Sequence, residues 1–313
     1  MAHQNVSHSL LKTIEVIHKI QTGEIPNTWE DYRKHGASAH FFPNTRELDH
    51  FTVYRARFIN EKKYDINQKN RHSYPEKKHV TSYGRANIPD YPVFYCAENM
   101  PGAIFETIWA TREDMIEYEN IMYVSQWELT TPYKFLFYDI SLRLSEVKKR
   151  FPHFSFFQQI NDKEILLMDT YLEFFESIFS SEKIHSISSG FAFMVMYGKL
   201  LEDGSIKEIM PADILKYRSV PFLGTFYNYA ISPKIIDNQT LELKKVFKIS
   251  LNSKMMEVAR NKSTLTELFR NTSITQSSTF EGGKLIKVGK LNDKDKTRID
   301  WADPDADDTN FEH

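Results

Sequence analysis

The chain has 313 residues, which is enough for one large domain with additions or for two small domains. Its formal net charge of −2 gives no electrostatic reason to expect direct binding to nucleic acid or to a membrane. The single cysteine, Cys96, excludes an intramolecular disulfide and a zinc site built from cysteines. The first ten residues are polar and no long apolar run follows, so we expect a soluble cytoplasmic protein.

The first 50 residues predict an N-terminal helical arm. Apolar residues recur at helical spacing from Leu10 to Ile20, and Gly23 and Pro26 end the pattern. A short second helix is expected from Trp29. The pattern leaves open whether this arm docks a partner or covers the core.

Residues 51–58 alternate as a strand, so Arg55 and Arg57 should point to the same side. Two arginines on one strand face indicate either a face in solvent or the wall of an anion site. The polar stretch 59–82 that follows is rich in basic residues. It is either a solvated loop or a mobile flap over a negatively charged ligand.

The chain is organised around residues 83–107, which predict a turn, a short buried strand and a helix. Asn99 is suited to cap this helix, and Pro101 is suited to its first turn. The helix is apolar except for one carboxylate, Glu106. Spacing alone allows two interpretations, an ordinary surface glutamate or a carboxylate held for chemistry.

The rest of the chain alternates between strand and helix patterns. Strands are expected at 121–129, 135–138, 214–220, 226–231, 241–251 and 284–288, and helices at 142–150, 163–181 and 188–201. The apolar stripes of the last two helices indicate core packing or a homo-oligomer face. Residues 291–313 form an acidic, polar tail, which we expect to be disordered.

Five separate pieces of the chain, in a fixed order, resemble a known family. They are Val53-Tyr54-Arg55, Gly84-Arg85-Ala86-Asn87, Val93-Phe94-Tyr95, Ala103-Ile104-Phe105-Glu106 and, far downstream, Ser219 followed by Asn228 and Ile231-Ser232-Pro233. Each piece alone is a weak signal, whereas the ordered set is specific. The set resembles the RES family, named for an arginine, a glutamate and a serine. The resemblance covers residues 50–250.

The resemblance implies an α+β fold with a mixed, split β core of the ADP-ribosyltransferase type. It also implies an enzyme that breaks the nicotinamide–ribose bond of NAD, with NAD as substrate and no metal. Water or phosphate as acceptor would give hydrolysis or phosphorolysis, and a macromolecule as acceptor would make the protein an ADP-ribosyltransferase. Many family members are toxins restrained by an antitoxin protein, which would be a partner here. A non-catalytic nucleotide-binding module is the remaining interpretation.

The resemblance also implies roles for individual side chains. Glu106 would stabilise the positive charge that develops on the ribose, and Ser219 would bond to Glu106 or to the substrate. Arg55 would bind the diphosphate, with Arg57 as its rival. The further NAD-binding candidates are Tyr95, Gly84, Arg85 and Asn87.

Each of these residues also has an ordinary structural interpretation. Arg55 can be a salt-bridge partner, Tyr95 a core tyrosine and Ser219 a turn residue. Asn228 is taken as a structural hairpin residue. The expected organisation is an arm at 1–50, a catalytic domain at 51–250 with a helical insertion at 140–205, an extension at 251–290 and a disordered tail at 291–313.

Overall fold

The structure is a computed structural model that describes residues 2–37, 44–110, 121–180, 186–200, 206–207, 211–219, 226–251 and 283–304. It confirms the predicted α+β class, with helices and both parallel and antiparallel strand pairs. The chain divides into two compact units. The helical unit comprises Met1–Arg46, Lys77–Pro92 and Phe135–Tyr217, and the sheet unit comprises Glu47–Glu76, Val93–Lys134 and Arg218–His313.

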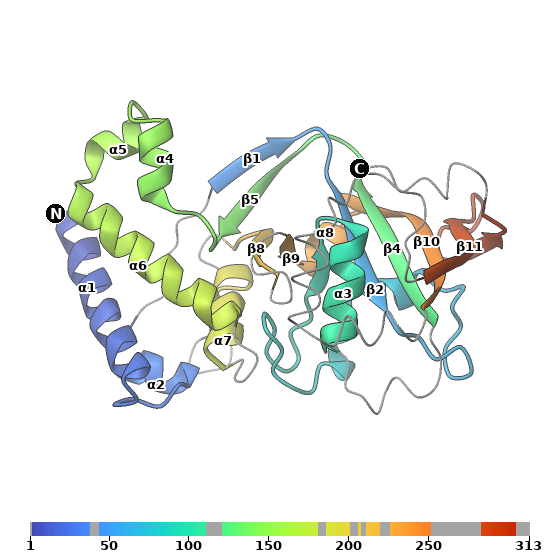
Figure 1. Ribbon diagram of the computed structural model, residues 1–313, viewed down its shortest axis with the longest axis horizontal. Helices are drawn as coiled ribbons and strands as arrows, with labels where there is room; N and C mark the ends of the chain where they lie inside the picture. Colours follow the sequence, from blue (N-terminus) through green and yellow to red (C-terminus); the bar gives the residue numbers. More distant parts are fainter. Residues whose placement is uncertain are drawn as a thin grey trace. The chain divides into compact units, whose positions relative to one another are not determined.

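The helical unit unites the predicted arm and the predicted insertion. Its helices are α1 (Ala2–Gln21), α2 (Trp29–Lys34), α4 (Leu144–Arg150), α5 (Ser155–Gln159), α6 (Asp162–Phe179) and α7 (Ser186–Met196). In Figure 1, α1 lies beside α6 and α2 beside α7, as their contacts require. Two parts predicted as separate therefore form one body, and the arm covers a core.

Aromatic side chains fill the centre of the helical unit. Phe175 of α6 stacks on Phe191 of α7 with ring centroids 3.9 Å apart, and Tyr32 of α2 meets Phe175 edge-on. The α6 helix starts at a capping box in which Asn161 and Glu164 each bond the other's backbone N–H. These contacts confirm core packing as the role of the apolar stripes on α6 and α7.

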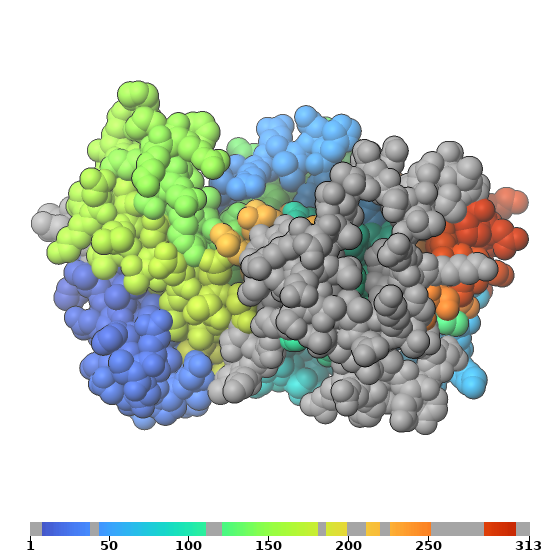
Figure 2. All heavy atoms as spheres, viewed as in Figure 1, coloured from blue at the N-terminus to red at the C-terminus, as the bar shows by residue number. Residues whose placement is uncertain are grey.

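Three aromatic side chains remain exposed where α4 passes into α5. Figure 2 shows this part of the helical unit, coloured yellow-green, on the molecular surface. Phe151, Phe154 and Phe156 are the exposed residues. A homo-oligomer face on the helical unit stays a prediction.

The strands of the helical unit include a parallel pair. β5 (Tyr133–Asp139) runs parallel to β8 (Ile214–Arg218), and β1 (Asn44–Leu48) lies on the other side of β5. A two-stranded sheet joins β6 (Lys199–Leu200) to β7 (Ile206–Lys207). β1 begins before the predicted strand at 51–58 and was not expected from the sequence.

The sheet unit contains seven strands in the order β9-β3-β2-β4-β10-β11-β12 among the described residues. They are β2 (Thr52–Arg57), β3 (Phe94–Ala97), β4 (Ile121–Leu129), β9 (Tyr227–Ile231), β10 (Leu241–Leu251), β11 (Gly283–Leu291) and β12 (Ile299–Ala302). The unit also holds the helices α3 (Met100–Ala110) and α8 (Pro233–Asp237) and the short 3-10 helix η1 (Lys69–His72). Consecutive strands in this order pair antiparallel.

This sheet nearly separates between β2 and β3. The two strands pair only at Tyr54 and Ala97, whereas β2 pairs with β4 along its whole length. β3 in turn pairs with β9 throughout Phe94–Ala97. The sheet unit thus consists of two well-paired parts that meet at a single position.

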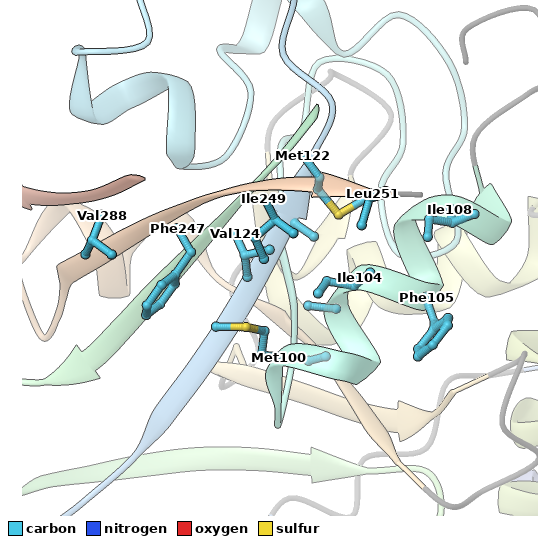
Figure 3. Packing of buried hydrophobic residues seen from close by; sticks show 13 residues of the cluster. Met100, Ile104, Phe105, Ile108, Met122, Val124, Phe247, Ile249, Leu251 and Val288 are labelled. Atoms are coloured by element: carbon cyan, nitrogen blue, oxygen red, sulfur yellow. The ribbon is translucent and has the colours of Figure 1, made fainter. Parts of the chain in front are cut away.

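The α3 helix covers one face of this sheet. Figure 3 shows Ile104 and Ile108 of α3 against Met122, Val124 and Ile249. Ala56 of β2 belongs to the same buried cluster. Because side chains alternate along a strand, Arg55 and Arg57 on β2 and Tyr123 on β4 occupy the opposite face.

The structure adds contacts to the predicted loop at 59–82 and corrects part of the predicted disordered tail. Within the stretch 59–76, Asn67 Oδ1 accepts a bond of 2.9 Å from Trp301 Nε1, and the backbone N–H of Lys69 donates to the carbonyl of Thr297. These bonds attach residues 67–69 to the segment 297–301, whereas residues 60–65 are exposed to solvent. Figure 1 shows the stretch 59–76 in light blue. Part of the predicted disordered tail forms β12, in which Ile299 is buried.

No helix among the described residues is long and apolar enough to cross a membrane.

Candidate active site

The α3 helix begins as the sequence predicts. Asn99 Oδ1 accepts a bond of 2.8 Å from the backbone N–H of Gly102, which satisfies one of the free donors at the helix start. Pro101 lies in the first turn, where a missing N–H costs nothing. This cap fixes the start of the helix and so the direction in which Glu106 points, nearly two turns later.

Glu106 is held by two buried donors from distant parts of the chain. Ser219 Oγ and Asn228 Nδ2 each donate a bond of 2.6 Å to Glu106 Oε1. Ser219 is 1% exposed and Asn228 is 4% exposed, while Glu106 itself is half-buried. Neither bond uses Oε2. The carboxylate is therefore oriented by the protein, and the residue is only partly exposed.

Close packing of α3 on the sheet makes these bonds reachable. A Cβ atom at Gly102 would lie 3.4 Å from the Cβ of Ala97 on β3. Asn228 on β9 is the direct cross-strand partner of Ala97, so its side chain lies on the same face. The backbone N–H of Ser219 donates to the carbonyl of Phe226, which precedes β9. Gly102 thus brings the helix close enough for Glu106 to reach both donors.

Substitution of Gly102 by alanine is expected to lower activity with little change in stability. The added Cβ would lie 3.0 Å from Asn99 Oδ1, so the cap or the helix must shift by a few tenths of an ångström. The gain in helix propensity, about 1 kcal/mol, offsets the cost of this shift. Displacement of Glu106 should still reduce the rate about tenfold. Turnover measured beside urea unfolding checks this, and a variant with the wild-type rate would contradict it.

Arg55 binds backbone where the sheet opens. Its Nη1 donates a bond of 2.7 Å to the carbonyl of Tyr95, and its guanidinium lies over the ring of Phe94 at 5.6 Å. The divergence of β2 from β3 deprives that carbonyl of an ordinary ladder partner, which the side chain replaces. Burial raises the pKa of the neighbouring Cys96 thiol, and the charge of Arg55 opposes this rise.

Tyr95 lies on the sheet face that carries the held carboxylate. It is paired with Ala230 on β9, and it precedes Ala97 by two residues on the same strand. Its side chain therefore shares a face with that of Asn228 and is half-buried. The predicted role of Tyr95 in binding NAD stays a prediction, and this placement is compatible with it.

The structure gives Arg57 a different set of contacts. Its Nη1 donates to the carbonyl of Arg71 at 3.0 Å and to that of Ser73 at 3.4 Å. These bonds attach the stretch 59–76 to β2. Arg55 and Arg57 both project from the face of β2 opposite α3, but Arg55 bonds the carbonyl of Tyr95 at the split of the sheet, whereas Arg57 bonds the stretch 59–76.

The Gly84–Asn87 piece forms a closed turn in the helical unit. The backbone N–H of Gly84 donates to the carbonyl of Asn87 at 2.9 Å, and Asn87 Nδ2 donates to the carbonyl of Ser82 at 3.1 Å. Arg85 lies between them. The predicted roles of these three residues in binding NAD stay predictions.

Asn228 has a contact that the sequence did not predict. It was interpreted as a structural hairpin residue, whereas its amide bonds directly to Glu106. An asparagine in the middle of the strand Tyr227–Ile231 is unfavourable for β structure, and this was the signal available in the sequence. Such a residue in a buried strand requires a polar partner, which here is the carboxylate.

The arrangement defines a class of site. One carboxylate is fixed by a hydroxyl and an amide under a capped helix, in an α+β protein whose sheet is nearly split. Ser219 donates its hydroxyl proton to Glu106, so the pair does not have the geometry of a serine nucleophile activated by histidine. No group of three or more His, Cys, Asp or Glu side chains suited to a metal ion occurs among the described residues.

Comparison with protein families assigns this part of the chain. The model of the RES domain matches residues 52–157, which include Arg55, Tyr95 and Glu106. The predicted membership of the RES domain family is thereby confirmed for this segment. Ser219 and Asn228 lie beyond the matched range and are joined to it by their bonds to Glu106. No curated protein and no solved structure matches the chain.

Proposed function

We propose that the protein cleaves the nicotinamide–ribose bond of NAD, with phosphate or water as the acceptor. One observation carries the proposal: Ser219 and Asn228 converge at 2.6 Å on one oxygen of Glu106, the glutamate of a matched RES domain. Burial of two polar donors costs desolvation free energy, which an ordinary surface glutamate does not require. The same two donors fix the carboxylate in the orientation that a catalytic group needs.

The proposed reaction follows from the charge of this group. The C–N bond breaks and its electron pair goes to the nicotinamide nitrogen, which leaves as a neutral ring. The ribose is left with positive, oxocarbenium-like charge, which the carboxylate of Glu106 stabilises. An oxygen of water or phosphate then bonds to the ribose carbon, and water loses a proton to the solvent. Ser219 and Asn228 hold the carboxylate in place, so little reorganisation accompanies the step.

The fold supports the same proposal. A sheet that is nearly split between β2 and β3 agrees with the split β core of an ADP-ribosyltransferase-like fold. Arg55 and Tyr95 lie at this split and are the proposed contacts for the diphosphate and the nicotinamide riboside. A cell that contains such an enzyme loses NAD unless a partner inhibits it, so the proposal extends to a toxin restrained by an antitoxin.

The test is NAD turnover by the purified protein with and without phosphate. Free nicotinamide should appear in both cases or only with phosphate, beside ADP-ribose or its 1-phosphate ester. Chromatography separates these products. Unchanged NAD under both conditions would overturn the proposal. Label transferred from NAD to proteins of a cell lysate, without free ADP-ribose products, would show a macromolecular acceptor instead.

A further inference from the structure

The sheet face opposite α3 carries two neighbouring arginines without a counter-charge among the described residues. Arg57 comes from β2 and Arg71 from η1. The nearby carboxylates are already paired: Glu61 lies 2.6 Å from Lys248, and Asp65 lies 3.7 Å from Arg298. Burial and the charge of Arg71 both lower the pKa of Arg57. The two cations thus repel each other in a partly desolvated place.

The same place contains buried polar atoms that lack an acceptor or donor. Arg71 Nε and Ser73 Oγ are buried and form no hydrogen bond in the structure. Ser73 is 7% exposed, so water does not readily replace the missing partner. Arg57 Nη1 bonds the carbonyls of Arg71 and Ser73, which gathers the three residues together.

Aromatic contacts fix the orientation of these groups. The guanidinium of Arg71 lies 4.9 Å from the ring centroid of Tyr64. The neighbouring imidazole of His72 is buried, and its Nε2 lies 2.8 Å from the carbonyl of Ile66. Stacking against an aromatic ring preorganises a guanidinium to present its N–H groups as a fork.

We propose that Arg57, Arg71 and Ser73 form a binding site for a phosphate-type oxyanion, either free phosphate or the phosphate group of a small ligand. The Nε and an Nη of Arg71 offer two parallel donors to such an anion, and Ser73 Oγ offers a third. The negative charge relieves the repulsion between the two guanidinium groups. No described carboxylate competes for this position.

The proposed site is separate from the Glu106 site. Arg57 follows Ala56 on β2, and Ala56 belongs to the buried cluster under α3. Thr107 of α3 also donates to the carbonyl of Ala56. Since successive side chains point to opposite faces, the arginine pair and α3 lie on different sides of the strand. The inference does not depend on the proposed cleavage of NAD.

The full chain is titrated with phosphate. Binding is measured by calorimetry and by the change in the thermal unfolding temperature. Sodium chloride at equal ionic strength corrects for screening. Saturable stabilisation by phosphate is expected, and Arg71→Gln and Ser73→Ala should each weaken the affinity at least fivefold. Adenosine monophosphate in place of phosphate shows whether the anion is held free or on a larger ligand.

Two matched variants make the result decisive. Arg150→Gln removes an exposed arginine at the end of α4 and should leave phosphate affinity unchanged. Glu106→Gln should also leave it unchanged, because the proposed site is on the other face. No saturable effect, equal affinity in Arg71→Gln, or loss of affinity in Glu106→Gln would overturn the proposal. Arg57 is left intact because it attaches the 59–76 stretch to β2.

Discussion

Replacement of Glu106 by glutamine is expected to reduce NAD cleavage about 10²–10³-fold, the usual effect of removing one preorganised electrostatic contact to a transition state. Glutamine has nearly the same shape, and its amide oxygen can still accept from Ser219 and Asn228. The change therefore removes the negative charge while it keeps the local packing. Measurement of nicotinamide release at saturating NAD gives the ratio of rates.

The matched control is Glu242→Gln. Glu242 is a glutamate of the same unit that lies on β10 and forms a side-chain ion pair with Lys244 at 3.5 Å. This substitution should leave the rate of NAD cleavage within twofold of the wild type, because ion pairs of this kind contribute little. Equal rates for wild type and Glu106→Gln would remove Glu106 from the reaction. A loss of rate accompanied by loss of the unfolding transition would indicate a folding defect instead.

Local patterns were sufficient to predict most elements that lie near the site. The strand expected at 121–129 is β4, and the cap at Asn99 starts α3 as predicted. Both depend on residues that are close in sequence, such as the alternation of apolar side chains and the offset between a cap and its third residue. Local rules therefore located Glu106 on a helix before the fold was known.

Long-range contacts decided what the sequence did not predict. The stretch 59–76 looks solvated because of its charges, yet its bonds to Thr297 and Trp301 span more than two hundred residues. Asn228 looks like a hairpin residue because its partner, Glu106, is 122 residues away. The spacing of apolar residues contains no information about such pairs. The resemblance to the RES family, by contrast, did predict that Ser219 lies close to Glu106.

Side chains of β2 contribute to both proposed sites, because they alternate between the two faces of the sheet. Ala56 supports α3 on one face, and Arg55 and Arg57 project from the other. Arg55 turns to the carbonyl of Tyr95 at the split of the sheet, whereas Arg57 turns to the stretch 59–76. The two arginines that the sequence treated as rivals for one diphosphate therefore have different neighbours.

Acidification from pH 6.5 to pH 4 is expected to lower the free energy of unfolding by about 3 kcal/mol through His72 alone. Burial lowers the pKa of His72 from 6.5 to about 4, and the charge of Arg57 adds to this effect. In that pH range the unfolded chain binds a proton at His72 that the folded chain does not. Stability due to this group is thus fully present above pH 6.5 and falls as the pH drops towards 4.

Urea unfolding at a series of pH values measures this effect, with His72→Gln as the comparison. Glutamine does not titrate and can still donate to the carbonyl of Ile66, as Nε2 of His72 does. Acid effects of the carboxylates are common to both proteins, so the difference between the two curves isolates His72. The difference should change by about 3 kcal/mol between pH 6.5 and pH 4. Parallel curves would mean that the folded protein binds a proton at His72 in this pH range, so that the pKa of His72 is not lowered. The burial of the imidazole against Tyr123 and Trp301 would then be less tight than the ring contacts indicate.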